Sequence, residues 1–226
     1  GFRNNAGGNF ISEDSILQRP VEEIFSSENF SNTFIETVEV TKPSDSYDAK
    51  QSINAAYLML DTRILERIRL VAGARIENST QTLNAFSDTG DDADVDRNYN
   101  DVLPSINLTY SATETINFRA GYSKTLARPE FRELASFTYF DFVANELVQG
   151  NPRLTRSLIN NFDLRFENFA GAGELYAVGL FYKDFKDPIE QILVASSSFE
   201  PTRSYRNAMS AITYGIELEV RKSLGF

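Results

Sequence analysis

"PSINLTYSATETINFRAGYSK", residues 104–124, contains two runs in which apolar and polar side chains alternate one by one, with a short polar connection between them. Alternation with a period of two places the apolar side chains on one face of a β-strand and the polar side chains on the other. The connection, SATET at residues 111–115, has a length typical of the links between neighbouring strands. The segment therefore predicts two strands, each with one apolar face.

The same alternation recurs on both sides of this segment, and it predicts seven strands in all. The strands are expected at residues 52–61, 68–77, 104–110, 116–124, 160–168, 174–183 and 212–221, of which the first alternates most weakly. Several have about the 9–11 residues that a tilted strand needs to cross a bilayer. A content of 10 Tyr and 18 Phe also favours β-structure.

The connections between these strands alternate in length. Short ones at 62–67, 111–115 and 169–173 take turns with long ones at about 78–101, 126–155 and 186–206. Outer-membrane barrels have short periplasmic turns and long extracellular loops, whereas loops in soluble sandwiches are commonly short. We therefore predict an all-β, antiparallel transmembrane β-barrel segment of about seven strands. A soluble or surface-exposed all-β binding domain with no transport role stays open as the alternative.

The composition of the 226 residues excludes several kinds of chemistry. The chain has no cysteine and no histidine, which excludes disulfides, thiol nucleophiles, imidazole bases and the usual zinc sites. A net charge of −10 argues against a nucleic-acid partner. The sequence shows no arrangement of a nucleophile with a base and no phosphate-binding glycine loop, so we expect no enzyme, no catalytic residues and no cofactor.

An acidic run at residues 88–101 resembles a calcium loop only in part. Asp92, Asp94 and Asp96 have the required spacing, but Arg97 and Leu103 stand where an EF-hand needs glycine and glutamate. A solvated external loop without a metal is the prediction for this run.

The alternation also predicts how the chain is organised. Residues 1–49 are polar and are expected to form an extracellular loop region before the first clear strand, and residues 50–226 a partial barrel. Seven strands that begin on one side of a membrane and end on the other would leave two open edges, which lipid does not tolerate. We therefore expect the barrel to be incomplete and the chain to be a fragment.

Several segments resemble a known family. YNDVLPSINLTYSATETINFRAGYSKTLARPEFREL (99–134) resembles the signature region of TonB-dependent outer-membrane receptors, especially those abundant in Bacteroidetes. GNPRLTRSLINNFDLRFENF (150–169) resembles the family's Gly-Asn-Pro-x-Leu segment and the strand after it. The segments at 53–79, 173–191 and 207–224 are similar to neighbouring hairpins, so that the resemblance covers about residues 45–226.

The resemblance implies a fold, a location and a set of partners. Such receptors are barrels of 22 strands in the cell outer membrane, filled by an N-terminal plug, and they import scarce solutes such as iron chelates, cobalamin, glycans or peptides with energy from TonB. This chain would be a later-middle part of the barrel. Its partners would be outer-membrane lipid, the plug domain and remaining strands of the same receptor, an unknown solute, and TonB only through a missing N-terminal part.

The long connection at 126–155 is the candidate ligand-binding region. The strand before it stops at Arg128-Pro129, because proline has no N–H to donate to a neighbouring strand. Aromatic and charged side chains follow, and they suit contact with a sugar, a peptide or a chelate. The candidate ligand-binding residues are Arg128, Glu130, Phe131, Arg132, Tyr139 and Phe140. Packing of the aromatic rings against neighbouring segments is the favoured interpretation, and ligand contact is the alternative.

The two faces of the strands are expected to meet different surroundings. The polar faces also hold Arg69 and Arg75, and their charges could pair across neighbouring strands. The residues predicted to face the lumen are Arg119, Asp163, Arg165, Glu167, Glu217, Glu219 and Arg221. The aromatic residues predicted to lie near lipid are Tyr57, Tyr110, Phe118, Tyr122, Phe162, Phe166, Tyr176, Tyr182 and Tyr214.

Overall fold

The computed structural model describes residues 20, 22, 46–85, 94–194 and 202–223. The chain divides into two compact units, residues 1–42 and 43–226, and every element discussed below belongs to the second unit. The predicted extracellular region 1–49 falls almost wholly outside the described residues. Among the described residues, no helix is long and apolar enough to cross a membrane.

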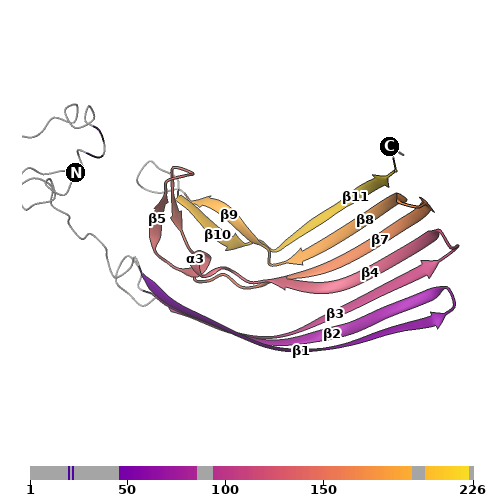
Figure 1. Ribbon diagram of the computed structural model, residues 1–226. Helices are drawn as coiled ribbons and strands as arrows, with labels where there is room; N and C mark the ends of the chain where they lie inside the picture. Colours follow the sequence, from indigo (N-terminus) through magenta and orange to yellow (C-terminus); the bar gives the residue numbers. More distant parts are fainter. Residues whose placement is uncertain (1–19, 21, 23–45, 86–93, 195–201, 224–226) are drawn as a thin grey trace, which may run out of the picture. The chain divides into compact units, whose positions relative to one another are not determined.

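Seven long strands form one curved sheet, as the alternation predicted (Figure 1). They are β1 (Tyr47–Leu65), β2 (Ile68–Ala85), β3 (Val95–Ser111), β4 (Ile116–Ala127), β7 (Ser157–Gly171), β8 (Glu174–Lys186) and β11 (Ser210–Arg221). Each strand pairs antiparallel with the strand beside it, in the order β1-β2-β3-β4-β7-β8-β11. Within the described residues, β1 and β11 are therefore open edges of the sheet.

The three short connections lie at one end of the sheet, also as predicted (Figure 1). Residues 66–67 separate β1 from β2, residues 112–115 separate β3 from β4, and residues 172–173 separate β7 from β8. Gly173 has a φ of 77° in the last of these turns, a backbone conformation that glycine adopts without steric cost. The tight links keep consecutive strands in a simple antiparallel order.

The first long connection is shorter than predicted, because β2 and β3 continue far beyond the expected strands. Residues 78–83 and 95–100, expected in a loop, pair with each other, and cross-strand side-chain hydrogen bonds accompany them. Asn78 Nδ2 donates to Asn100 at 2.8 Å, and Thr80 Oγ1 donates to Asn98 at 2.7 Å. Residues 86–93, including Asp92 of the considered calcium pattern, lie outside the described residues.

The other two long connections contain short elements of their own. After β4 come α3 (Phe131–Leu134), β5 (Thr138–Asp141) and β6 (Glu146–Gln149), and after β8 come β9 (Ile189–Val194) and β10 (Thr202–Asn207). These strands form a second sheet in the order β5-β6-β10-β9, at the end of the molecule opposite the short turns (Figure 1). Both connections were predicted as loops, and this part of the prediction was wrong in its detail.

One face of the seven-stranded sheet is apolar and bare. Leu108, Ala120, Leu164, Leu180 and Ile216 follow one another as paired positions across five strands. Leu164 is 56 % exposed and Ile216 is 70 % exposed, so no described part of the chain covers this face. A soluble domain would bury such a face within itself, and the alternative of a soluble binding domain therefore loses its support.

Aromatic side chains flank this apolar row on both sides. Tyr122, Phe162, Tyr182 and Tyr214 are paired positions on one side, with ring centroids 5.0 Å apart between the first two and 6.2 Å between Phe162 and Tyr182. On the other side are Tyr110, Phe118 and Phe166, with centroid separations of 6.5 and 5.3 Å. Two aromatic rows around an apolar band are typical of a transmembrane barrel wall.

Tyr57 was assigned to the wrong face. It pairs with Arg75 in the charged face, whereas the next residue, Leu58, pairs with Ala74 in the apolar face. Residues 55–60 are apolar at odd and even positions alike, so the alternation there could not decide the face. The pairing of β1 with β2 decides it instead.

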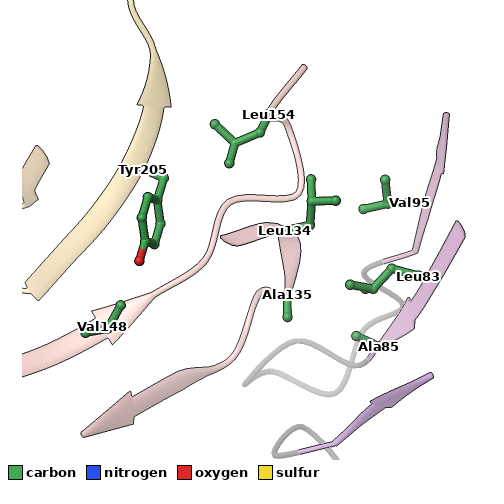
Figure 2. Packing of buried hydrophobic residues seen from close by; sticks show 8 residues of the cluster. All are labelled: Leu83, Ala85, Val95, Leu134, Ala135, Val148, Leu154 and Tyr205. Atoms are coloured by element: carbon green, nitrogen blue, oxygen red, sulfur yellow. The ribbon is translucent and has the colours of Figure 1, made fainter. Parts of the chain in front are cut away.

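The small hydrophobic core lies on the opposite face, at the end of the molecule that carries the second sheet. Leu83, Ala85 and Val95 point from the ends of β2 and β3 toward Leu134 and Ala135 of the α3 segment (Figure 2). The remaining members come from the same two connections: Val148, Leu154 and Tyr205. The core therefore packs both connections against the charged face of the seven-stranded sheet, which we call the wall.

Candidate functional site

The charged side chains predicted to share a face do so, because their strand pairing has no shift between them. Arg119 pairs with Arg165, which pairs with Gly179, which in turn pairs with Glu217. Asp163 is the partner position of Gly121 and of Phe181 on the same face.

Ion pairs connect these side chains across the face. Arg119 lies 2.8 Å from Glu167, and Arg165 lies 2.9 Å from Glu167 and 2.6 Å from Glu219. Glu219 also contacts Arg221 at 2.6 Å. The contact between Arg165 and Glu219 reaches from β7 over β8 to β11. The result is a continuous network of alternating charges on the wall.

The Arg-Pro segment after β4 turns over this same face. The guanidinium of Arg128 donates to Glu77 at 2.6 Å and to Ser79 Oγ at 3.3 Å, and the Arg128 side chain is only 13 % exposed. Gln81 Nε2 donates to the carbonyl of Pro129 at 2.9 Å. Arg128, a predicted ligand contact, thus bonds to the wall.

Arg156, at the other end of the connection between β4 and β7, also forms an ion pair with the wall. Arg156 lies 2.8 Å from Asp101, and its guanidinium stacks over the ring of Tyr99 at 4.0 Å. Asp101 is the partner position of Glu77, and both carboxylates are buried. Two carboxylates on directly opposed positions repel each other, so each needs its arginine. Sequence reasoning missed this pair because it placed residues 78–101 in a loop.

The α3 turn uses three of the predicted ligand-binding residues locally. Glu130 caps the turn, and its backbone N–H donates to the side chain of Glu133 at 2.9 Å. Phe131 packs against the hydrophobic core. Arg132 stacks over the ring of Tyr139, with 4.7 Å to the centroid, and Tyr139 itself packs against the core.

The end of β5 and the β5–β6 turn hold two exposed aromatic residues. Phe140 is 40 % exposed, Phe142 is 87 % exposed and Val143 is 99 % exposed. The rings of Phe140 and Phe142 meet edge to face at 5.1 Å. Among the predicted residues, Phe140 is therefore the one aromatic of the described part that faces outward.

Asp141 fixes the shape of this turn. Its carboxylate accepts hydrogen bonds from the backbone N–H groups of Val143 at 2.9 Å and Ala144 at 3.1 Å, and from Arg203 at 3.0 Å. The two backbone bonds and then the Arg203 guanidinium lower the pKa of Asp141 below the ordinary 3.8 of an aspartate. The charged carboxylate is thus the form that holds the turn.

Tyr205, in contrast to Asp141, has a raised pKa. Burial in the core, followed by the nearby Tyr139, raises the pKa of its hydroxyl above the ordinary 10.0. In the part of the chain that the structure describes, no three acidic side chains gather in a way that could hold a metal ion. The chemistry of the site is therefore one of charge pairs, packed rings and an exposed aromatic turn.

Comparison with known proteins identifies a family for this chain. A model of the family described as TonB dependent receptor-like, beta-barrel matches residues 4–226. Among curated proteins, none matches the chain.

Solved receptor structures share the fold at low sequence identity. A double mutant of the Serratia marcescens hemophore receptor HasR, in complex with its hemophore HasA and heme, superposes with a TM-score of 0.62 and 14% identity. That match covers 76% of this chain and 32% of the receptor chain. The siderophore receptor PirA from Acinetobacter baumannii gives 0.52 and 16%, over 77% of this chain and 26% of that one.

The alcaligin outer membrane receptor FauA from Bordetella pertussis is a third match, with a TM-score of 0.51 and 18% identity. It covers 77% of this chain and 27% of the receptor. The chain thus spans about a third or less of the length of these receptors. At these identities the comparison with structures shows the fold alone.

Proposed function

The chain belongs to the TonB dependent receptor-like β-barrel family, and from this we propose that it forms part of the wall of an outer-membrane receptor for the TonB-dependent uptake of a scarce solute. Its apolar face lies against outer-membrane lipid, and its charged face lines the lumen. The plug domain and the remaining barrel strands of the same receptor are its partners. TonB acts through the N-terminal part of that receptor.

One observation carries this proposal: the sheet is apolar on one face and charged on the other. The apolar row from Leu108 to Ile216 is exposed, and it lies between two aromatic rows. The other face carries the network of arginines and carboxylates. A lipid-facing outside and a polar lumen need this division of side chains.

The extracellular end offers a candidate contact for the solute. Glu130, Arg132 and Phe140 are exposed there, and Phe142 lies beside Phe140. We assign solute contact to these four, whereas Arg128, Phe131 and Tyr139 serve to hold the segment on the wall. The solute is one of the classes that such receptors import: an iron chelate, a glycan, a peptide or cobalamin. No catalytic role is assigned to the chain.

A pair of neighbouring substitutions tests the membrane assignment. In the receptor that contains this chain, Leu108→Lys places a charge on the apolar face, and Asn107→Lys places the same charge on the polar face. A lysine facing lipid near the bilayer midplane costs about 2–4 kcal/mol, while a lysine in the lumen costs little. We expect Leu108→Lys to reduce the folded receptor in the outer-membrane fraction, measured by its mobility in unheated gels, and Asn107→Lys to leave it unchanged.

Equal behaviour of the two variants would contradict the membrane assignment. Uptake is tested separately with four labelled probes, a ferric catecholate chelate, cobalamin, an oligosaccharide and an oligopeptide, in cells with and without TonB. Accumulation of one probe only when both the receptor and TonB are present supports the proposed function. A receptor in the outer membrane that binds a probe without any TonB-dependent uptake would contradict it.

A further inference from the structure

The two structured connections at the extracellular end are joined through their backbones. β6 belongs to the first connection and β10 to the second, and they pair in parallel, with Leu147 opposite Thr202 and Val148 opposite Arg203. We call α3, β5, β6, β9, β10 and residues 150–156 the loop module. Since the second sheet contains strands from both connections, neither can leave without breaking this pairing.

The side chain of Asn207 joins the same two segments a second time. Its Oδ1 accepts hydrogen bonds from the backbone N–H of Thr155 at 2.9 Å and from the Thr155 hydroxyl at 3.4 Å. Its Nδ2 donates to the carbonyls of Thr155 at 3.0 Å and Asp187 at 2.7 Å. One amide group therefore bridges the end of the first connection and both ends of the second.

Asn151 makes a similar bridge from the opposite side. Its Nδ2 donates to the carbonyl of Tyr205 in β10 at 2.8 Å, while its backbone N–H donates to the carbonyl of Glu133 in α3 at 2.6 Å. Arg203 of β10 adds ion pairs to Asp141 at 3.0 Å and Glu146 at 3.1 Å. β5 and β6 are thus bonded to β10 directly, and α3 is connected to it through Asn151.

The loop module is also bonded to the wall. Arg97 of β3 donates to the carbonyl of Pro152 at 3.1 Å, in addition to the ion pairs that Arg128 and Arg156 make with β2 and β3. The hydrophobic core unites side chains from β2 and β3 with Leu154 of the first connection and Tyr205 of the second (Figure 2). Bonds of this kind open together, because separating one pair exposes the partners of the next.

We propose that the loop module is a single cooperative unit: the connections β4–β7 and β8–β11 open and close together, and neither moves by itself. The surface that they present to the outside is then preformed, which lowers the ordering cost of binding. This inference concerns the movement of the chain and does not depend on which solute the receptor takes.

Amide hydrogen exchange of the purified receptor tests the proposal without any substitution. We expect the protected amides of β5 and β6 and those of β10 to share one opening equilibrium, as members of one cooperative unit do. Asn207→Ala removes the amide bridge. It should accelerate exchange in β5, β6 and β10 alike by about tenfold or more, while Arg206→Ala, its exposed neighbour, changes none of them.

Acceleration confined to β10, with β5 and β6 unchanged, would overturn the proposal. So would opening equilibria in the unsubstituted receptor that differ widely between the two connections.

A cysteine pair supplies an independent measurement in living cells. Leu147→Cys with Thr202→Cys places two thiols on paired positions of neighbouring strands, within the range that a disulfide spans. Leu147→Cys with Val194→Cys is the matched control, since β10 separates β6 from β9. We expect nearly complete cross-linking of the first pair on the cell surface and none of the control. Equal and low cross-linking of both pairs would show that β6 and β10 are not paired, and it would overturn the proposal.

Discussion

Gly150 shows how one missing side chain can determine the packing of a whole segment. A Cβ atom at this position would clash with the carbonyl oxygen of Ala135 and lie 2.9 Å from that of Arg132. Only glycine therefore lets residues 150–154 run directly against the α3 turn, where Asn151 reaches Tyr205 and Leu154 enters the core. The Gly-Asn-Pro-x-Leu segment is thereby explained by close packing.

Gly150→Ala should loosen the loop module while the barrel wall stays intact. Overpacking of this kind costs about 1–3 kcal/mol. Since about 1–2 kcal/mol changes an opening equilibrium by roughly 5- to 30-fold, trypsin should cleave at Arg203 and Arg206 on intact cells faster by that factor. Gly171→Ala is the control, because a Cβ there meets Glu174 only at 3.6 Å. An unchanged cleavage rate for Gly150→Ala would contradict the packing argument.

Arg128 is expected to matter for stability through Glu77. Breaking a buried ion pair by removing one partner costs about 3–5 kcal/mol, and Arg75, 2.6 Å from Glu77, should hold the loss near the lower end. Arg128→Met should therefore lower the temperature at which the folded receptor loses its gel mobility and raise its cleavage rate.

The double variant Arg128→Met/Glu77→Gln should recover part of this loss, because the buried charge is then also gone. Arg153→Met, at an exposed position, serves as the control and should behave like the unsubstituted receptor. A double variant as unstable as the sum of its single changes would show that the two side chains do not act as a pair.

The sequence predicts the strands better than any other element, but it predicts only part of the length of β2. β2 alternates clearly up to Ile76 and Glu77, which is where the expected strand ends. From Asn78 to Thr82 both faces are polar, with Asn78 and Thr80 outward and Ser79 and Gln81 buried under the first connection. Alternation cannot be seen when both faces are polar, so the sequence predicts a loop where β2 continues.

The change from apolar to polar on the outward face also marks a boundary in the wall. Ile76 and Val102 are paired on that face, and two positions further along the strands Asn78 is paired with Asn100. β2 has 18 residues. A strand of that size is about 60 Å long, whereas the apolar band of a barrel is about 25 Å tall. The outer parts of β2 and β3 therefore stand in water above the lipid.

The β5–β6 turn should respond to acid through Asp141. Because its pKa is lowered in the folded chain, the carboxylate stabilises the turn at pH values above 3.8, and this contribution is lost as the pH falls through the lower, folded value. The chain has no tryptophan, so Phe142→Trp provides a fluorescent probe on the turn. Its emission anisotropy, corrected for the receptor without this substitution, should fall with a midpoint below pH 3.8.

Asp141→Asn in the same background is the control. It removes the titrating group, so no transition should remain in this range. A transition of unchanged midpoint in Asp141→Asn would assign the effect to another carboxylate.

At the scale of the whole chain, the seven-stranded sheet is one layer whose apolar face is uncovered and whose edge strands β1 and β11 have no further strand beside them within the described residues. Exposed apolar faces and unpaired strand edges lead to aggregation in water. Residues 1–226 expressed alone should therefore aggregate in buffer and stay dispersed only in detergent, as measured by light scattering. A monodisperse, folded chain in buffer would contradict the assignment of the apolar face to lipid.

Features that depend on neighbouring residues could be predicted from the sequence, whereas contacts between residues far apart in the chain could not. Seven strands and their short turns could be predicted because alternation and turn length are local features. The second sheet could not, since its β6–β10 pairing joins residues about 55 positions apart and its strands have only four to six residues. The same holds for the contacts of Arg128, whose partner Glu77 lies 51 positions earlier.

The parallel pairing of β6 with β10 also constrains the order in which the chain can acquire its structure. Contacts between distant positions form slowly, because a large loop must close before they are made. Until Arg203 and Tyr205 have been synthesised and delivered to the membrane, Val148 and Asn151 lack their partners from β10. The β4–β7 connection is thus expected to remain unfolded until the next hairpin is in place, so that the extracellular surface matures last and as a consequence of completed insertion.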